Sequence, residues 1–343
     1  MKLKKILVNT IDGKYPILIG KNITPRLKDI LNRNNIFSSK ILLVIDNKVP
    51  STIIKKIKKS FKKKIFLFYL TSNERNKSQK SVDKIINILL KNKFNRNDCL
   101  ISIGGGIIGD LSAYAASIFK RGLSYVSIPT TLLAQVDSSI GGKTGINSKY
   151  GKNLIGSFYQ PKLVVSDISF LKSLPKREIL CGYAEIFKHS IISDKLFFYF
   201  LDKNIKKILH LKSPFIEKSI YKSCMIKKNV VEKDFKEKNL RKILNFGHTF
   251  GHAYESALGY SSKLNHGEAV ILGISSAAKF SQQIKILNKN DYNLISEHIK
   301  KISSQIKLKN FFKNHNIKKI TSFMSNDKKN SDEKINLILI KKV

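Results

Sequence analysis

Three histidines and a glutamate have the types and surroundings of metal ligands. His248 and His252 stand four residues apart in NFGHTFGHA, which places both side chains on one face of a helix. The Glu of an HExxH motif is absent, since Thr249 holds that position, and this argues against a zinc protease. His266 follows in NHGEAV, and Glu185 lies in the apolar segment AEIFKH. Three protein ligands with one open position describe a catalytic zinc site, although histidines with a purely structural role remain the alternative.

A glycine-rich turn has the placement of a phosphate site. The apolar run CLISIG at residues 99–104 leads into further glycines, Gly105 and Gly106, and an Ala-rich helical stretch begins near Asp110. Glycines between a strand and a helix let backbone N–H groups meet a pyrophosphate. The spacing is GGGxxGD rather than GxGxxG, so a simple tight turn is the alternative. The placement favours a site for a dinucleotide.

A second polar segment, PTTLLAQVDSSIGGKT, covers residues 129–144. Its GGKT resembles the end of a Walker A motif, but Asp137 stands where that motif needs its first glycine, which excludes a triphosphate loop. Asp137 and Lys143 lie beside flexible glycines, and Lys152 and Asn153 follow shortly after. Such residues at the edge of a sheet suit an anionic, hydroxylated substrate. The alternative is a solvated lysine-rich loop.

The first half of the chain contains the pattern of an α/β domain. A hairpin is predicted around Asp12-Gly13, between runs at residues 5–10 and 15–20. Further strands are predicted at residues 40–47, 64–70, 99–104 and 124–129, and an apolar stripe predicts a helix over 78–91. Alternating strands and helices predict a mainly parallel, Rossmann-like sheet with helices on both faces, which binds its ligands at the carboxyl ends of the strands.

The second half reads as an all-helical domain. Helices are predicted at residues 176–193, 214–234, 245–258, 266–284 and 291–301. The segment INLILI at 335–340 predicts a strand added at a sheet edge, and 326–334 predicts a loop. A chain of 343 residues exceeds the size of a single core, about 250–300 residues, so we expect two domains, 1–173 and 174–343.

The composition limits the classes of function. The net charge is +40, but its lysines are spread along the chain among Ile and Asn, as in a genome with AT-rich codons. We therefore expect no nucleic-acid partner, with a basic nucleic-acid-binding protein as the alternative. No run approaches the roughly 18–20 apolar residues of a membrane span, and no signal peptide is apparent, so we expect a cytoplasmic protein.

The remaining histidines and the cysteines give weaker signals. His210, His298 and His315 stand among lysines and are expected to be solvated. The three cysteines are far apart and lack CxxC spacing, which indicates reduced thiols rather than disulfides or a zinc ribbon.

Taken in order, these segments resemble the 3-dehydroquinate synthase family of sugar phosphate cyclases. The resemblance rests on GGGIIGD (104–110), FKRG (119–122), the run at 129–147, GKNLIGSFYQP (151–161), AEIFKH (184–189), LRKILNFGHTFGHA (240–253) and NHGEAV (265–270). It implies an N-terminal NAD-binding α/β domain and a C-terminal helical domain that binds metal and substrate.

The resemblance also implies a role for individual residues. The metal ligands are Glu185, His248 and His266, which moves His252 from the metal to the phosphate of the substrate. The catalytic residues are Lys143, Lys188, Glu237 (as proton acceptor) and His252. The substrate contacts are Arg121, Asp137, Asn153, Lys227, Arg241, Asn245 and Lys328. The cofactor contacts are Asn47, Glu74, Lys77, Gly105, Gly106, Asp110, Thr130, Thr131, Lys143, Lys152, Phe170, Leu171, Lys172 and Ser173.

The implied activity converts 3-deoxy-D-arabino-heptulosonate 7-phosphate to 3-dehydroquinate and phosphate in the shikimate pathway. It proceeds by transient oxidation with NAD, loss of phosphate, return of the hydride and an intramolecular aldol step, and it requires zinc or cobalt. The resemblance further implies a homodimer. One departure is Ser72-Asn73, which replaces the first residues of the family's DGExxKS segment.

Two rival enzymes remain. One is a related cyclase that acts on a sedoheptulose phosphate or an amino-substituted analogue, against which Asp137, Lys143 and Asn153 argue. The other is a metal-dependent alcohol dehydrogenase of the glycerol dehydrogenase type. The residues expected at the substrate's phosphate argue against this second rival; they are Lys143, Asn153, Lys188 and His252.

Overall fold

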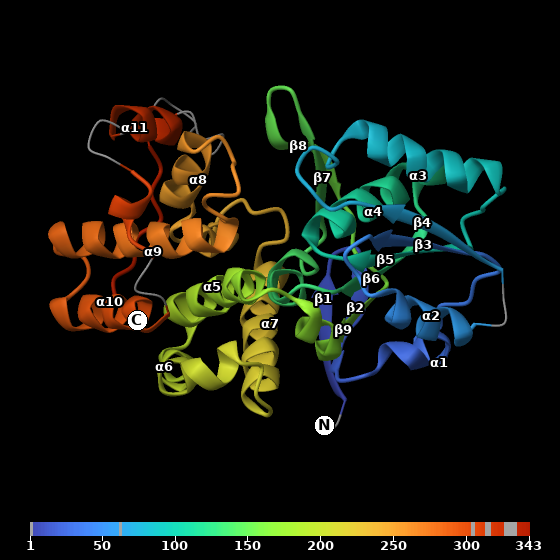
Figure 1. Ribbon diagram of the computed structural model, residues 1–343, viewed down its shortest axis with the longest axis horizontal. Helices are drawn as coiled ribbons and strands as arrows, with labels where there is room; N and C mark the ends of the chain where they lie inside the picture. Colours follow the sequence, from blue (N-terminus) through green and yellow to red (C-terminus); the bar gives the residue numbers. More distant parts are fainter. Residues whose placement is uncertain (1–2, 62–63, 303–305, 313–316, 326–334) are drawn as a thin grey trace. The chain divides into compact units, whose positions relative to one another are not determined.

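The computed structural model describes residues 3–61, 64–302, 306–312, 317–325 and 335–343 (Figure 1). The chain divides into two compact units, Met1–Pro175 and Lys176–Val343. Each unit is described by itself. None of the helices formed by the described residues is both long and apolar enough to cross a membrane.

The first unit is built on a seven-stranded sheet of order β1-β2-β9-β6-β5-β3-β4. β1 and β2 form an antiparallel hairpin, and the other neighbouring pairs are parallel. The strands are β1 (Lys4–Thr10), β2 (Gly13–Gly20), β3 (Ile41–Asp46), β4 (Ile65–Leu70), β5 (Cys99–Gly104), β6 (Ser124–Pro129) and β9 (Leu163–Asp167). The predicted hairpin and parallel sheet are therefore confirmed.

Helices cover both faces of this sheet, as predicted. Successive strand residues point to opposite faces, so Leu43 packs with α1 (Leu27–Arg33) and α2 (Ser51–Lys59), whereas Leu42 packs with α3 (Gln79–Lys91) and α4 (Gly106–Ile118). Every residue of β3 and β5 is buried. Burial on both faces explains why these strands are continuous apolar runs rather than alternating ones.

The sequence analysis missed β9 and a second, two-stranded sheet. β7 (Lys143–Ser148) and β8 (Gly151–Phe158) pair antiparallel in a hairpin of their own. Both strands are rich in polar residues and glycine. All eight residues of β8 are half-buried or exposed, so no alternation of buried and exposed side chains marks it as a strand. A Cβ at Gly156 would lie 2.0 Å from the carbonyl oxygen of Thr144, so glycine is required for this close pairing.

The second unit is helical. Its helices are α5 (Lys176–Ser193), α6 (Lys195–Leu209), α7 (Phe215–Lys233), α8 (His248–Ala257), α9 (His266–Gln283), α10 (Lys289–Ile302) and α11 (Ile317–Ser325), with a 3-10 turn η5 (Leu240–Asn245) before α8. The five predicted helices are confirmed, whereas α6 and α11 were not foreseen. α8 begins three residues later than predicted because Asn245 closes η5 and Gly247 has a φ of 78°.

The strand predicted at 335–340 is wrong. These residues have extended, irregular backbone, and Thr249 Oγ1 donates a hydrogen bond to the carbonyl of Asn336. A strand needs a neighbour to take its backbone hydrogen bonds, and among the described residues the helical unit offers none. The predicted loop at 326–334, which includes Lys328, lies outside the described residues.

Candidate functional site

Three predicted metal ligands from three helices meet in the second unit. Glu185 lies on α5, His248 is the first residue of α8 and His266 is the first residue of α9. One ligand atom from each lies within 4.8 Å of the others. The Nε2 atoms of His248 and His266 are 3.6 and 3.8 Å from Glu185 Oε1. One carboxylate and two imidazoles are a donor set that suits Zn²⁺ or Co²⁺.

The surroundings of Glu185 fit a bound cation. Its two carboxylate oxygens are buried, and within the described part of the chain neither accepts a well-formed hydrogen bond. Lys188, one turn along α5, pairs with Oε2, and both side chains are at most 2% exposed. Burial raises the pKa of Glu185, but the charge of Lys188 and the contact with His266 outweigh it and hold that pKa well below its usual value. The carboxylate is therefore ionised and available as a ligand.

The same charges act on His266. Burial lowers its pKa, but contacts with the carboxylates of Glu185 and Glu255 overcome this effect and raise it to about 10. A proton therefore occupies the imidazole at neutral pH when no metal competes for it. Metal binding must displace this proton, because only the lone pair of a neutral ring coordinates.

Close helix packing brings these ligands together. A Cβ at Gly273 of α9 would lie 2.0 Å from the carbonyl oxygen of Gly247, the residue that precedes α8. A Cβ at Gly267 would lie 2.3 Å from the Cα of Cys181 on α5. Both positions leave no room for a side chain. The glycines that flank the histidines in the sequence therefore allow α5, α8 and α9 to approach closely at the metal site.

His252 is not part of the three-residue group, although spacing alone nominated it. It lies one turn after His248 on α8, and the two rings are edge to face with centroids 5.3 Å apart. A helix positions residues i and i+4 on one face, but the ligand that completes the group comes from another helix. The three donor atoms that lie close together therefore come from His248, His266 and Glu185, while a role of His252 at the phosphate stays a prediction.

The predicted substrate residues of this unit lie on α7 and in the connection to α8. Lys227 is buried on α7, and Arg241 is buried with Nη1 donating to the carbonyl of Phe235 at 2.6 Å. Asn245 Nδ2 donates to Glu237 Oε1 at 2.6 Å. Lys328 lies outside the described residues. The structure therefore joins the predicted proton acceptor Glu237 to one of the predicted substrate contacts.

Glu255 was missed by the sequence analysis. Its Oε2 lies 3.2 Å from Nδ1 of His266. A signal was present, because Glu255 follows His248 by seven residues, close to two helical turns, and so shares its face of α8.

The glycine-rich turn of the first unit lies where the sequence predicts it. β5 ends at Gly104, Gly105 precedes the helix and α4 starts at Gly106. A Cβ on Gly105 would lie 3.1 Å from Thr131 Cγ2, and a Cβ on Gly106 would lie 3.0 Å from Ser138 Oγ, so both glycines are closely packed. A pocket lies beside this turn, and its walls include the turn itself together with Asp110, Ser138, Gly142, Lys143 and Thr144.

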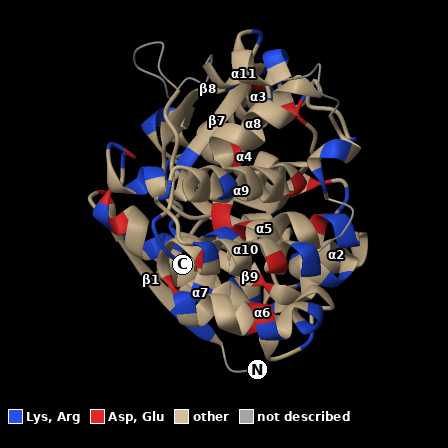
Figure 2. Cartoon of the chain, turned by 90° about the vertical axis from the view of Figure 1, so that its left-hand side faces the viewer, with Lys and Arg blue, Asp and Glu red and all other residues tan. Residues whose placement is uncertain are grey.

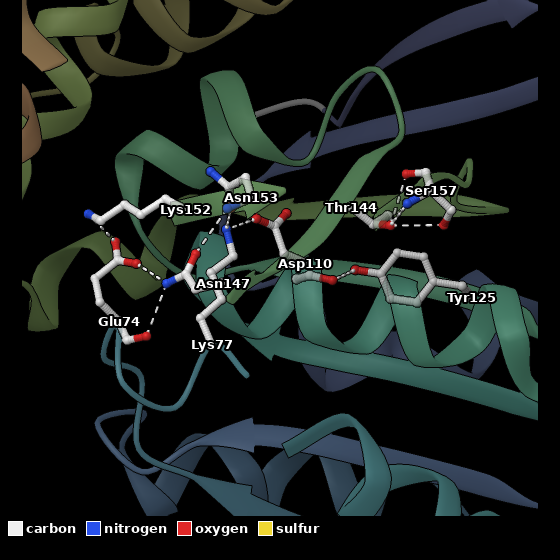
Figure 3. Close-up of polar contacts among 10 residues, drawn as sticks. Glu74, Lys77, Asp110, Tyr125, Thr144, Asn147, Lys152, Asn153 and Ser157 are labelled. Carbon is white, nitrogen blue, oxygen red and sulfur yellow. Dashed lines mark hydrogen bonds and ion pairs between the residues drawn. The ribbon is translucent and has the colours of Figure 1, made fainter. Parts of the chain in front are cut away.

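A polar network beside this turn joins residues predicted to contact the cofactor and the substrate (Figure 3). Lys77 Nζ lies 2.5 Å from Asp110 Oδ2 and donates to Asn153 Oδ1 at 2.5 Å. Lys152 Nζ lies 3.1 Å from Glu74 Oε1, and Asn147, which sequence reasoning missed, donates to Glu74 Oε2 at 2.8 Å. Burial raises the pKa of Glu74, but Asn147 and Lys152 lower it below its usual value.

The other predicted residues of the first unit are placed as follows. Asn47 follows β3 and donates to Thr71 Oγ1 at 2.9 Å. Asp137 lies in the π-helical turn η3 (Ala134–Ser138), and Phe170 to Ser173 lie in the 3-10 helix η4 (Ile168–Ser173). Thr130 and Thr131 follow β6 directly, and Lys143 starts β7. Phe170 packs in the core against the sheet, so only its backbone can face a ligand.

Strained backbone occurs at several predicted site residues. Arg121, Asn153 and Glu237 have φ values of 63°, 55° and 57°, in the left-handed region that residues other than glycine seldom adopt. Positive φ values also occur at residues outside the predicted site, such as Asn22, Leu211 and Lys285, so they do not mark the site by themselves.

One expectation about histidines is wrong. His298 is fully buried, and its ring atoms lie 2.9 Å from Tyr183 Oη and 2.8 Å from Asp202 Oδ1. Lys301, one turn further along α10, donates to the other oxygen of the same Asp202 carboxylate at 2.7 Å, so a lysine nearby in the sequence does not imply a solvated ring. His210 is exposed as expected, and His315 lies outside the described residues.

Comparison with known proteins gives consistent matches. The family model of the 3-dehydroquinate synthase N-terminal domain matches residues 67–181, and that of the C-terminal domain matches 182–330. A 3-dehydroquinate synthase of Pelagibacter ubique is 58% identical over 100% of this chain and 94% of its own length. That of Bartonella quintana is 39% identical over 99% of this chain and 92% of its own.

Solved structures share the fold at lower identity. A 2-deoxy-scyllo-inosose synthase complexed with carbaglucose-6-phosphate, NAD⁺ and Co²⁺ matches with a TM-score of 0.89 and 24% identity, over 99% of this chain and 93% of that one. A 2-epi-5-epi-valiolone synthase from Streptomyces hygroscopicus with NAD⁺ and Zn²⁺ matches with a TM-score of 0.83 and 22% identity, over 96% and 90%. A glycerol dehydrogenase from Schizosaccharomyces pombe matches with a TM-score of 0.68 and 15% identity, over 94% and 84%.

Proposed function

The chain belongs to the 3-dehydroquinate synthase family, and we propose that it converts 3-deoxy-D-arabino-heptulosonate 7-phosphate to 3-dehydroquinate and phosphate. It is then a carbon–oxygen lyase that uses NAD and a divalent metal. The observation that carries this proposal is the group Glu185, His248 and His266, in a chain that matches a curated relative over its full length.

The residues of the two units fit the two cofactors. Bound NAD supplies a hydride acceptor, and bound Zn²⁺ or Co²⁺ supplies a Lewis acid that polarises hydroxyl groups. The glycine turn at β5–α4 and the network around Lys77 would hold NAD. Glu185, His248 and His266 would hold the metal, and the ionised, buried carboxylate of Glu185 contributes the negative charge of that site.

Cationic side chains suit the charge of the substrate, which carries a carboxylate and a phosphate. Lys188, Lys227 and Arg241 are all at least nine-tenths buried, and cations that have already lost water gain strongly from an anionic ligand. Arg241 can bind such a group through two N–H bonds. His252 would bind the phosphate, and Glu237 would accept a proton. Asn245 holds the carboxylate of Glu237 in place.

One assay tests the proposal. The metal-replete protein is incubated with the seven-carbon phosphate and a catalytic amount of NAD, and phosphate release is followed. We expect many phosphates per NAD and no net NADH, since the hydride returns within each turnover. Net accumulation of NADH would instead indicate a dehydrogenase.

A related cyclase activity is the second candidate. The solved structures with TM-scores of 0.89 and 0.83 are named for cyclases that form other products, so the fold alone does not select the substrate. A sedoheptulose phosphate should be offered in parallel. Turnover of that compound, with none of the seven-carbon keto acid, would refute the proposed substrate.

We further propose that the protein acts as a homodimer in the cytoplasm, without nucleic acid or membrane partners. Its three cysteines are buried and not joined by disulfides, which suits a reducing compartment. Light scattering from the purified protein tests the dimer, and fractionation of the host cell tests the location.

A further inference from the structure

We propose that Glu255 is the positioning residue that orients His266 for metal binding. This inference rests on the metal site proposed above and concerns a residue outside the ligand set. It predicts that Glu255 controls metal affinity and coordination geometry without contacting the ion.

The argument begins with the two nitrogens of His266. Nε2 lies 3.8 Å from Glu185 Oε1 and therefore faces the ligand group. The other ring nitrogen, Nδ1, points in a different direction and lies 3.2 Å from Glu255 Oε2. A carboxylate accepts a hydrogen bond, so the pairing keeps a proton on Nδ1 and leaves the lone pair of Nε2 to the metal. Metal-bound histidines are commonly fixed in this way by an acceptor behind the ring.

His248 shows the same arrangement with a different acceptor. Its Nε2 lies 3.6 Å from Glu185 Oε1, and its Nδ1 lies 3.3 Å from the backbone carbonyl of Phe246. Both histidines thus present Nε2 to the site and Nδ1 to an acceptor. For His266 this acceptor is a side chain, so its orientation can be tested by a simple substitution.

Glu255 also connects the two helices that supply the histidines. It lies on α8 two turns after His248, and it contacts the first residue of α9. Its side chain is 12% exposed, so water competes weakly for the carboxylate. α8 therefore provides one ligand directly and orients the other.

The backbone of His266 is held by other contacts. Asn265 Oδ1 accepts from Glu268 N at 2.8 Å, and Glu268 Oε2 accepts from Asn265 N at 2.9 Å, which together cap α9. Arg177 donates through Nε and Nη2 to Glu268 at 2.8 and 2.5 Å. Removing Glu255 should therefore release the imidazole ring while α9 keeps its start and its position.

The test compares Glu255→Ala and Glu255→Gln with the full-length wild type. Gln keeps a carbonyl acceptor of the same size without the charge. Ser256→Ala is the matched control, because Ser256 is the next residue of α8 and bonds to the exposed Tyr260. Each protein is stripped of metal and titrated with Co²⁺ against a chromophoric chelator, and the visible spectrum of the bound Co²⁺ is recorded.

We expect Glu255→Ala to weaken Co²⁺ binding roughly 10- to 100-fold and to change the Co²⁺ spectrum, as is typical when the acceptor behind a ligating histidine is removed. Glu255→Gln should lose less, and Ser256→Ala should match the wild type. If Glu255→Ala does not fold, the isosteric Gln variant carries the test.

Two outcomes overturn the inference in different ways. If the wild type binds no Co²⁺, the proposed metal site fails and the role of Glu255 fails with it. If the wild type binds Co²⁺ and both Glu255 variants bind it equally well with an unchanged spectrum, the metal site stands and the role of Glu255 is refuted.

Discussion

At the scale of single residues, the metal site combines ionised and protonated groups within a few ångströms. Lys188 pairs with Glu185, and Glu255 contacts the ring of His266. Glu185 and His266 also act on each other, so all four side chains contribute to the balance of charge. The two carboxylates give the site the negative charge that a cation needs. In the metal-free protein, the charge of Lys188 and the proton on His266 balance that negative charge. Its affinity for metal must therefore depend on pH.

We predict that metal affinity rises with pH, by about tenfold per unit between about pH 6 and 8. The pKa of His266 is raised to about 10, so across this window the ring is protonated in the metal-free protein. Each binding event then releases a proton, and a higher pH favours binding. Titration calorimetry with Co²⁺ in buffers of different ionisation enthalpy measures the proton released. An affinity independent of pH would contradict the charge state assigned to His266.

A second prediction concerns the cofactor network. Lys77→Met removes the ion pair with Asp110 and the hydrogen bond to Asn153, both at 2.5 Å. Hydrogen bonds to charged groups contribute about 1.5–3 kcal/mol, so the Kd for NAD should rise roughly tenfold or more. Lys80→Met, an exposed lysine at the start of α3, is the control and should leave the Kd unchanged. The NAD affinity of all three proteins is measured by calorimetry, and an unaltered Kd in Lys77→Met would disprove the assignment.

At the scale of elements, the packing of α8 on α9 decides the site. The two histidine ligands are the first residues of these helices. Gly247, just before α8, packs closely against Gly273, two turns into α9. The contact between α5, α6 and α10 is polar instead. There the buried ring of His298 on α10 lies within hydrogen-bonding distance of Tyr183 on α5 and Asp202 on α6. Glycines thus position the metal ligands on α8 and α9, whereas a hydrogen-bonded histidine joins α5, α6 and α10.

We predict that Gly273→Ala loosens the site. Its Cβ would lie 2.0 Å from the carbonyl oxygen of Gly247, so α8 and α9 must move apart. Overpacking of this kind costs about 1–3 kcal/mol of unfolding free energy. Metal affinity should fall as well, because the two histidines separate. Ser275→Ala, two residues along α9, should lose neither stability nor affinity. Denaturant unfolding and metal titration measure both effects, and a variant with wild-type values would show that this contact is not required.

At the scale of the whole chain, the net charge of +40 is the dominant feature. Lys and Arg lie on helices and strands of both units rather than on a single element (Figure 2). Charges spread in this way repel one another in the folded state and attract anionic metabolites in general.

We therefore predict that added salt stabilises the protein. Raising NaCl from about 0.02 to 0.5 M shortens the screening length from roughly 20 Å to a few ångströms, which weakens the repulsion. The melting temperature should rise by several degrees, as measured by calorimetry in the metal-loaded form. A melting temperature that falls with salt would mean that attractive ion pairs outweigh the repulsion. A nucleic-acid binder would instead show an affinity for duplex DNA that falls steeply with salt and ignores metal.

The sequence by itself determined the local elements and the nature of the chemistry. Apolar runs set β3 to β6, apolar stripes set five helices, and the glycine turn before α4 fell where its motif places it. These features depend on residues close in the chain, whose period of two or near four is visible in one dimension. β7 and β8 escaped because their residues are largely polar or glycine and mostly not buried, so no period of two marks them.

Only the tertiary structure decided which side chains converge. Helical spacing favours His248 with His252, yet the group that meets is His248 with His266 and Glu185, from three helices. Glu255 behind His266 and Asn147 beside Glu74 became visible for the same reason. Convergence depends on how closely helices cross and where each begins, and a few glycines fix this through contacts remote in the sequence. The segment at 335–340 has the pattern of a strand but lacks a neighbouring strand to pair with, so its pattern alone could not reveal its conformation.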